Sequence, residues 1–282
     1  MAHILITGTS GFIGQALAQH LAEQHDVVCM SRQPTDVPGV TAIQGDFTSP
    51  DDLDRLDPYE IDALLHLAAV TSFGTEDEQL SVNVLGTRRL LRYLIDRGCR
   101  KFVLASSIAA AGVLCPEFLP AALPIPDDHP CQDNKGYGFS KYLMEELGRY
   151  ISRQEPDVDM IVIRLCGVMA DDAARKHQTA QPPLTWSLAA ISPMYLSDAL
   201  RCFTLAAASP QKPGYRLMNT AGPQACVVGG MAEIMRAKYA GHAEGLDLSH
   251  YERPGHERDP VFDTRLIEAE LGFVPERAVQ AE

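Results

Sequence analysis

The stretch TGTSGFIG, residues 7–14, decides the fold of this chain because it joins a short apolar segment to an amphipathic one. Residues 3–7 are predicted to form a buried strand, and residues 12–24 carry apolar side chains at helical spacing. Gly8 permits a sharp turn, Gly11 lets the backbone approach a ligand, and Gly14 allows close packing of helix on strand. The simpler alternative is a tight turn that binds nothing.

The start of the predicted helix is suited to bind phosphate. Its first turn offers N–H groups and a partial positive charge, so that a pyrophosphate is held without any basic side chain. A place between a first strand and a first helix favours this interpretation over a plain turn. We therefore expect a dinucleotide to contact the following loop residues: Gly8, Ser10, Gly11, Phe12, Ile13 and Gly14.

Strand and helix patterns alternate along the first 165 residues. Further strands are expected at 26–30, 63–68, 102–105 and 160–165, and helices from 49, at 81–97 and at 138–153. Such alternation predicts an α/β fold, a doubly wound parallel sheet covered on both faces by helices. Beyond Gly167 the regularity decays, with isolated helices at 198–207 and 231–239. We expect residues 1–165 to form a dinucleotide-binding core and residues 166–282 mostly a small substrate-binding lobe, with 192–207 returning to the core.

Composition excludes several classes of protein. With 282 residues and 46% hydrophobic content the chain can bury one large core. A net charge of -13 argues against nucleic acid or an anionic membrane as the main partner. Seven scattered cysteines without a C-x-x-C pair, and no apolar run of 18 residues, predict a cytoplasmic protein with reduced thiols. We expect no metal site, and His66 on an apolar strand is read as a core histidine.

The ends of the next strands bear on the choice of cofactor. Ser31 and Arg32 offer no acid for a ribose 2′-hydroxyl but do offer a guanidinium for a 2′-phosphate, which favours NADP over NAD. A solvated surface arginine is the alternative. Asp46, followed by Phe47, can accept from the adenine amino group, although a simple turn explains it too. The cofactor is expected to cross the small residues that end the fourth strand: Leu67, Ala68 and Ala69.

Two residues near the start of the 138–153 helix point to proton transfer. Tyr137 and Lys141 stand four residues apart and so project from one helix face. A nearby ammonium favours the phenolate and moves the pKa of the tyrosine toward the working range, while Lys141 can also donate to ribose hydroxyls. Ser107, at a strand end, can hydrogen-bond a substrate oxygen. Alone the pair is most often a surface feature, but the glycine loop and Ser107 favour a reacting centre.

Together these residues strongly resemble the extended short-chain dehydrogenase/reductase family, also called the NAD-dependent epimerase/dehydratase family. The resemblance rests on the following motifs: TGTSGFIG at 7–14, Gly45-Asp46, HLAA at 66–69, NVLGT at 83–87, Ser106-Ser107, YGFSK at 137–141, Arg164, YLSD at 195–198 and RPGH at 253–256. It implies a Rossmann-like fold with Tyr137 as general acid/base, Lys141 and Ser107 as its catalytic partners, and Asn83 and Val168 near the cofactor. It also implies a homodimer through the helices at 81–97 and 138–153.

Departures from the family pattern narrow the substrate. Ile108 follows Ser107 where the dehydratases place an acid, which disfavours elimination. CGVMA at 166–170 replaces the segment typical of nucleotide-sugar epimerases, and only 33 residues lie between Arg164 and Asp198, so the lobe is compact. This is similar to the short sugar-acid dehydrogenases of the family. Trp186 and Arg253 are candidate substrate contacts, the arginine for a diphosphate, a carboxylate or a phosphate.

Three functions fit these patterns. The first is an oxidoreductase that transfers a hydride between nicotinamide and a secondary alcohol or carbonyl of a sugar-like or other small polar substrate. The alternative is a nucleotide-sugar epimerase that retains its cofactor. A non-catalytic dinucleotide sensor is a third reading, and the intact pair of Tyr137 and Lys141 argues against it.

Overall fold

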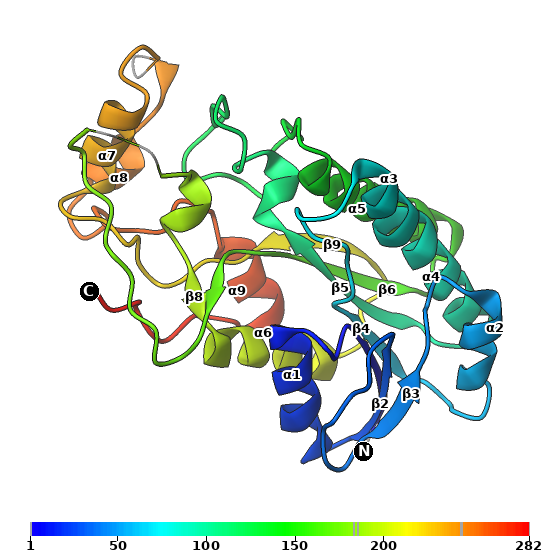
Figure 1. Cartoon of the computed structure of the whole chain (residues 1–282). Helices are drawn as coiled ribbons and strands as arrows, with labels where there is room; N and C mark the ends of the chain where they lie inside the picture. Colours follow the sequence, from blue (N-terminus) through cyan, green and yellow to red (C-terminus); the bar gives the residue numbers. More distant parts are fainter. Residues whose placement is uncertain (1, 183, 185, 243–244, 282) are drawn as a thin grey trace.

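A computed structural model describes residues 2–182, 184, 186–242 and 245–281. Seven parallel strands form one sheet in the order β3-β2-β1-β4-β5-β6-β9 (Figure 1). Their bounds are β1 His3–Thr7, β2 Asp26–Ser31, β3 Thr41–Gln44, β4 Ala63–His66, β5 Lys101–Ser107, β6 Asp159–Leu165 and β9 Gly214–Asn219. The prediction of a doubly wound α/β fold is confirmed.

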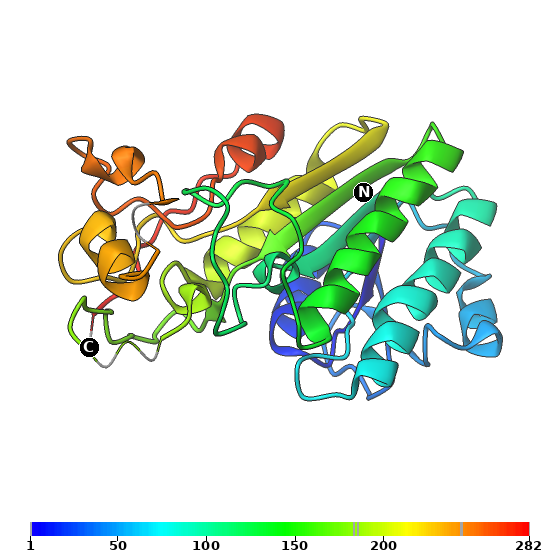
Figure 2. The same cartoon turned by 90° about the horizontal axis from the view of Figure 1, so that it is seen from above.

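Helices cover both faces of the sheet (Figure 1, Figure 2). One face carries α1 Phe12–Ala22, α6 Leu196–Ala208 and α9 Arg265–Leu271. The other carries α2 Pro50–Leu53, α4 Thr87–Asp96 and α5 Tyr137–Gln154. Shorter helical turns are η1 Asp54–Leu56, α3 Glu76–Leu80, η2 Ser81–Gly86 and η3 Ile108–Ala111.

The core is divided in two by the sheet, because successive side chains of a strand point to opposite faces. Ile4 and Ile6 of β1 belong to the cluster that includes Leu17 of α1. Leu5, between them, belongs to the cluster that includes Leu90 of α4. Strands buried on both faces are therefore apolar throughout, which is why their sequences are continuous hydrophobic runs.

The helical stretch predicted at 81–97 begins five residues earlier than expected. Thr75 accepts a hydrogen bond from the backbone N–H of Glu78, whose carboxylate accepts from the N–H of Thr75 in return. This capping box starts α3, and the chain continues through the π-helical turn η2 into α4. The sequence reading placed the start at the apolar periodicity and overlooked the cap.

The C-terminal part mixes core and lobe. α6 packs against α1, and β9 joins the sheet beside β6, a strand that the sequence reading did not predict. The remaining elements are β7 Val168–Met169, η4 Leu188–Ala190, β8 Met194–Tyr195, α7 Met231–Lys238 and α8 Ser249–Glu252. α7 and α8 lie beyond the sheet at the upper left of Figure 1. The division at residue 165, with 192–207 as part of the core, stays a prediction.

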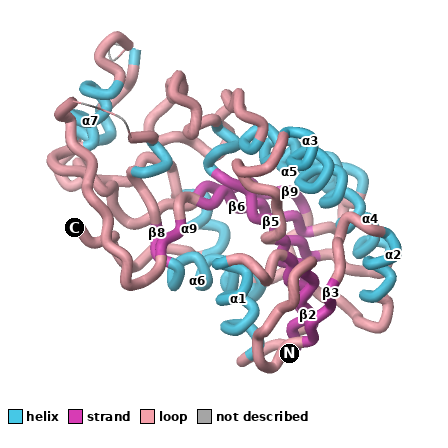
Figure 3. Tube along the Cα trace, viewed as in Figure 1, coloured by secondary structure: helices cyan, strands magenta, loops and turns pink. Residues whose placement is uncertain are grey.

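Two long segments without regular structure run over this end of the molecule, drawn as pink tube in Figure 3. Residues 112–136 connect η3 to α5, and residues 170–187, of which 183 and 185 are not described, connect β7 to η4. In the first segment, one bond ties the two ends together and another holds the middle. Gln132 N–H donates to the carbonyl of Ala111, and Ile125 N–H donates to that of Val261.

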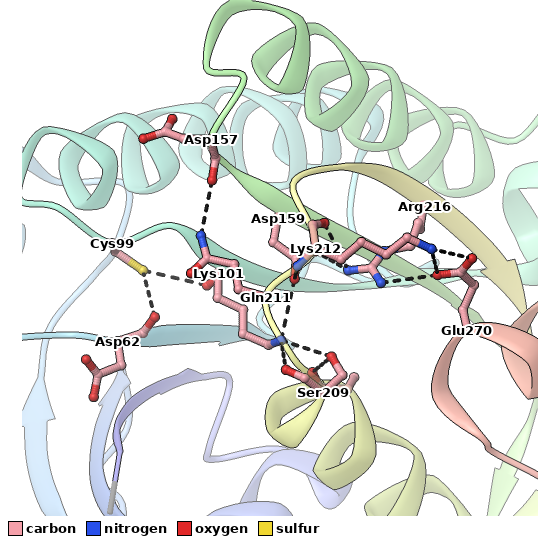
Figure 4. Close-up of polar contacts among 11 residues, drawn as sticks. Asp62, Cys99, Lys101, Asp157, Asp159, Ser209, Gln211, Lys212, Arg216 and Glu270 are labelled. Carbon is pink, nitrogen blue, oxygen red and sulfur yellow. Dashed lines mark hydrogen bonds and ion pairs between the residues drawn. The ribbon is translucent and has the colours of Figure 1, made fainter.

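A buried charged network lies at the amino ends of the strands, opposite the carboxyl ends (Figure 4). Asp159, at the start of β6, pairs with Arg216 of β9 and with Lys101 of β5, whose Nζ lies 3.5 Å from the carboxylate. Arg216 also lies 3.3 Å from Glu270 and so ties α9 to the sheet. Open α/β sheets bind ligands at the carboxyl ends of their strands, so this network at the amino ends is structural.

The prediction that the cysteines are unpaired agrees with the structure, in which all seven are free thiols. Among the described residues, no helix has both the length and the apolar surface needed to cross a membrane.

Candidate active site

The loop between β1 and α1 is shaped by two glycines. Gly8 has φ +81°, and a Cβ on it would lie 2.6 Å from the backbone nitrogen of Ala68. A Cβ on Gly14 would overlap the carbonyl oxygen of Gly8, so α1 approaches the loop only because both residues lack side chains. In the described part of the chain, no side chain caps the first turn of α1 and no acid lies in it. Its N–H groups are therefore a fit for a diphosphate.

The end of β2 lies beside this loop. The hydroxyl of Ser31 donates to that of Ser10 over 3.0 Å, and Arg32 is exposed, with its carbonyl accepting from Gln44. Asp46 accepts from the N–H of Thr48 at 2.8 Å. A polar edge thus extends from the glycine loop to Arg32.

A cavity of about 350 Å³ opens at the carboxyl ends of β1, β4, β5 and β6. It brings together the glycine loop and all three predicted catalytic residues. The predicted residues that line it are Gly8, Gly11, Phe12, Ile13, Gly14, Leu67, Ala69, Ser107, Tyr137, Lys141 and Val168.

Tyr137 reaches Ser107 because α5 packs unusually close to η3. A Cβ on Gly138 would overlap the carbonyl oxygen of Ala109, so only glycine permits this approach. Asp133 accepts from the N–H of Phe139 at 3.0 Å and fixes the chain where it enters the helix. The first turn of α5 is thereby set against the end of β5.

Lys141 is buried in the wall of the cavity. Its ammonium donates to the carbonyl of Ala105 over 2.7 Å. Burial lowers the pKa of Lys141 to about 8, and the charge of Glu145 opposes this shift. His66, behind it, bonds Thr7 and Thr87 with its two ring nitrogens, and burial lowers its pKa to about 3. The neutral core histidine expected from the sequence is therefore what the structure contains.

The phenol of Tyr137 responds first to its burial. Burial raises the pKa of Tyr137, and the hydroxyl of Ser107 acts in the opposite direction. The expectation that Lys141 lowers this pKa is not met, because burial raises it and Ser107 is the group that lowers it. Desolvation of the phenolate raises the pKa by more than the hydrogen bond with Ser107 lowers it.

Asn83 supports the site without entering the cavity. Its side-chain oxygen accepts from the N–H of Val70, and its amide nitrogen donates to the carbonyl of Val70 and to the hydroxyl of Ser140. Asn83 thus ties the loop after β4 to the first turn of α5. Its role in holding the cofactor stays a prediction.

The structure places other predicted residues outside the cavity. Phe47 is buried with its ring edge-on to His66 at 5.0 Å between centroids. Trp186 lines a second cavity of about 410 Å³ together with Lys238, whose ammonium lies 4.5 Å from the centre of the indole. Arg253 lines a third. The remaining predicted residues that do not line the cavity with Tyr137 are Ser10, Ser31, Arg32, Asp46, Ala68 and Asn83.

Several cavity residues were not predicted. They are Thr71, Ala105, Ser106, Leu165 and Cys166. Three of them end β5 or β6 or lie one residue from such an end, so the rule that ligands sit at carboxyl strand ends would have found them. The sequence analysis applies that rule to the ends of the second to fourth strands and, on the fifth, to Ser107 alone.

One cluster of side chains could hold a metal ion by its geometry, and it is the one such cluster among the described residues. It consists of His250, His256 and Asp259, whose ligand atoms all lie within 4.8 Å of one another. Both rings bond the same carboxylate oxygen, at 2.9 and 2.8 Å. Arg253 donates to Nδ1 of His250 at 2.7 Å. A metal on Nε2 would place a proton on that Nδ1 and oppose the arginine, so the geometry favours a hydrogen-bonded cluster. The expectation of no metal stays a prediction.

A strand-to-helix glycine loop, a parallel sheet and a Ser-Tyr-Lys cavity define a Rossmann-type short-chain dehydrogenase/reductase. Residues 4–189 match the NAD dependent epimerase/dehydratase family, and the chain belongs to it.

Curated relatives resemble about half of the protein. The UDP-glucose 4-epimerase of Pisum sativum is 27% identical over 183 residues, which are 57% of this chain and 51% of the relative. The D-erythronate dehydrogenase of Haemophilus influenzae is 33% identical over 180 residues, 57% of this chain and 53% of the relative. The aligned region thus spans about half the length of these relatives.

Solved structures resemble the fold over nearly the whole chain. A short-chain dehydrogenase/reductase superfamily protein from Agrobacterium tumefaciens, solved with bound NAD, has a TM-score of 0.70 at 22% identity. The superposition covers 98% of this chain and 93% of that chain. The UDP-glucose 4-epimerase of Thermotoga maritima has a TM-score of 0.72 at 17% identity, with coverage of 98% and 94%.

Proposed function

We propose that this protein is an NAD(P)-dependent oxidoreductase acting on a secondary alcohol or carbonyl of a sugar-like or other small polar substrate. The observation that carries the proposal is that Ser107, Tyr137 and Lys141 line one cavity with the glycine loop. The cofactor, when bound, accepts or supplies the hydride.

The chain's own residues handle the proton and the alignment. Tyr137 holds or takes the proton at the substrate oxygen, and the hydroxyl of Ser107 hydrogen-bonds the same oxygen. Lys141 keeps a positive charge beside the phenol and donates to the ribose. Asn83 keeps these groups in register through Val70 and Ser140. The other residues proposed to hold the cofactor are Ser10, Phe12, Ile13, Ser31, Arg32, Asp46, Phe47, Leu67, Ala68, Ala69 and Val168.

We propose NADP as the preferred cofactor, with NAD as the alternative. The end of β2 presents Ser31 and an exposed Arg32 in place of an acid. A guanidinium attracts a 2′-phosphate, whereas NAD-selective sites use a carboxylate there. The Agrobacterium tumefaciens neighbour was solved with NAD. Its identity of 22% to this chain is too low for its cofactor preference to be transferred.

The proposed substrate is small. The segment between β6 and α6 is short, and the relative named D-erythronate dehydrogenase supports a dehydrogenase with a substrate of modest size. Trp186 and Arg253, proposed earlier as contacts, line cavities other than the one with Tyr137. Their involvement requires a substrate that extends beyond the reacting carbon.

The test is a panel of aldoses, sugar acids and nucleotide sugars assayed with NADP and with NAD. The Tyr137→Phe variant should lose turnover by about 10²-fold or more, because the proton has no other route. Tyr142→Phe, five residues further along α5, is the matched control and should retain full rate. Wild-type turnover in Tyr137→Phe would overturn the assigned chemistry.

A nucleotide-sugar epimerase is the second candidate, favoured by relatives that carry the name UDP-glucose 4-epimerase. An epimerase returns the hydride to its substrate and retains its cofactor. Denaturing the purified protein and measuring released dinucleotide separates the two. Near-stoichiometric dinucleotide, with interconversion of sugars and no net change in cofactor absorbance, would replace the first proposal by this one.

We also propose a homodimer formed through α4 and α5 and a location in the cytoplasm. The dimer is supported by exposed apolar side chains, such as Leu85 just before α4 and Tyr150 on α5. Seven unpaired cysteines support the cytoplasmic location. Light scattering of the eluted protein measures the mass, and a monomer would remove the dimer proposal.

A further inference from the structure

A buried ion pair lies directly behind the reacting groups. Glu145 of α5 and Arg164 of β6 make two parallel hydrogen bonds, Nε to Oε1 and Nη2 to Oε2, both 2.8 Å. Their side chains are only 1% and 2% exposed. The hydroxyl of Ser106 donates to the same carboxylate at 2.6 Å. Isolated burial of either charge would be costly, so both are held in one geometry.

Each member of this network adjoins a residue that lines the cavity. Glu145 stands one helical turn after Lys141 and so shares its face of α5. Ser106 directly precedes Ser107 at the end of β5, and Arg164 precedes Leu165 at the end of β6. The pair is therefore placed to act on the site without touching a ligand.

The surroundings of Lys141 contain few other charges. The titratable groups that face Lys141 or the pair behind it are Tyr137 and Glu145 from α5, His66 from β4, Arg164 from β6, Tyr215 from β9, and Asp127, His129 and Cys131 from the 112–136 segment. Burial raises the pKa of Asp127 to about 6, and its charge acts on Arg164. Burial raises the pKa of both tyrosines and of the thiol and lowers that of His66, so these groups stay neutral. β5 and η3 contribute only hydroxyl and backbone groups at this point.

Glu145 is the carboxylate that favours the charged form of Lys141. Burial alone pushes the pKa of Lys141 downward, and the charge of Glu145 acts against that shift. Lys141 forms no ion pair with a described residue, since its direct partner is the carbonyl of Ala105. Its charge therefore depends on a carboxylate that Arg164, and not Lys141, holds in place.

We propose that Glu145 and Arg164 form a positioning pair, in which the two guanidinium hydrogen bonds of Arg164 fix the carboxylate of Glu145 one helical turn behind Lys141. The proposal rests on the catalytic assignment of Tyr137 and Lys141 made above. Without Arg164 the carboxylate loses both of these hydrogen bonds, and with them its fixed place behind Lys141. Arg164 also donates to the carbonyl of Asp127 at 3.0 Å, which anchors the 112–136 segment to the same strand.

The opposite end of β6 supplies a matched control. Asp159 is as deeply buried as Glu145 and pairs with Arg216 and Lys101 (Figure 4). Five residues of strand separate Asp159 from Arg164, about 16 Å at the rise of a β-strand. Asp159→Asn removes a paired carboxylate from the same sheet at a distance from Lys141.

The experiment measures NADP affinity by fluorescence from pH 6 to 10 in the full chain. The wild-type affinity should fall as pH rises through about 8, where Lys141 loses its proton. In Glu145→Gln the fall should begin about one pH unit lower, which makes binding about fivefold weaker at pH 8 and about tenfold weaker at pH 9. Asp159→Asn should keep the wild-type profile. An unshifted Glu145→Gln curve, a flat wild-type curve, or an equal shift in Asp159→Asn would overturn the proposal.

Arg164 variants cover the case in which Glu145→Gln does not fold. Arg164→Lys keeps a charge beside Glu145 and should retain the wild-type profile, whereas Arg164→Met should shift it in the direction expected for Glu145→Gln. Identical profiles for the two would contradict a role for the arginine charge. The proposed function is tested by a different measurement. Full turnover in Tyr137→Phe would contradict the proposed function and would not change the pH dependence of NADP binding.

Discussion

Gly138 and Ala109 approach so closely that a single methyl group on the glycine would overlap the carbonyl oxygen of the alanine. This contact sets the first turn of α5 against η3 and hence places Tyr137 in the cavity with Ser107. A residue without a side chain thus determines where the reacting phenol lies.

Gly138→Ala should therefore destabilise the fold and misplace Tyr137. Forcing a methyl group into a packed contact costs about 1–3 kcal/mol, and turnover should fall because the phenol moves away from the substrate oxygen. Urea unfolding and initial rates measure the two effects. Gly241→Ala is the control, since a Cβ there meets nothing within 4 Å. Equal behaviour of the two variants would show that the contact relaxes without consequence.

Ser107→Ala should slow the reaction and move its pH profile. Loss of one donor to the reacting oxygen lowers kcat by about 10²-fold. The serine also lowers the pKa of Tyr137, so the tyrosine-dependent limb should move to higher pH in the variant. Ser152→Ala, which removes a hydroxyl of α5 that bonds no described residue, should change neither quantity. A slower Ser107→Ala enzyme with an unmoved profile would separate the two roles.

Arg32→Ala should discriminate between the two nicotinamide cofactors. Removing the guanidinium should weaken NADP binding by about tenfold, or about 1.4 kcal/mol, and leave NAD binding nearly unchanged. The effect should shrink at high salt because Arg32 is exposed. Isothermal titration gives both affinities, with the exposed Arg88→Ala as control. Tighter binding of NAD than of NADP by the wild type would remove the role given to Arg32.

The buried Lys141 should make stability rise with pH. Its pKa is about 8 in the folded protein, below the ordinary value of 10.5, so the unfolded chain binds more protons between these values. The destabilisation is complete below pH 8 and is relieved as pH rises toward 10.5. The free energy of unfolding of Lys141→Met, relative to wild type, should be largest near pH 7 and shrink above pH 8. Lys135→Met, which changes an exposed lysine, serves as the control. A stability difference between Lys141→Met and the wild type that does not change with pH would contradict the lowered pKa of Lys141.

The first half of the fold was predictable because local patterns and the global fold agree there. The glycine loop, the alternating strands and the Tyr137 motif each carry a signal that lies within a few residues. β9 was missed because its sequence GYRLMN begins with three partly buried residues, one of them an arginine, and lies at a sheet edge, so it lacks the apolar run of the inner strands. Edge strands give weaker patterns than buried ones.

The chemistry of the site was predictable by residue type, and its electrostatics was not. Spacing placed Tyr137 and Lys141 on one face of a helix. The sequence could not reveal that burial raises the pKa of the phenol, because burial depends on the packing of α5 against η3 and β5. For the same reason Trp186 and Arg253 were grouped with the site, although the fold places them in other cavities.

Ser107 and Tyr137 stand at the two ends of one excursion of the chain, residues 108–136, whose return is fixed by Asp133 and whose middle is anchored by Arg164. The middle of the segment is also tied to the sheet, because Ile125 is buried in the core and its carbonyl accepts from the side chain of Asn219 at the end of β9. A change in the length of this segment would therefore act on these anchors, and through them on the placement of Tyr137 opposite Ser107.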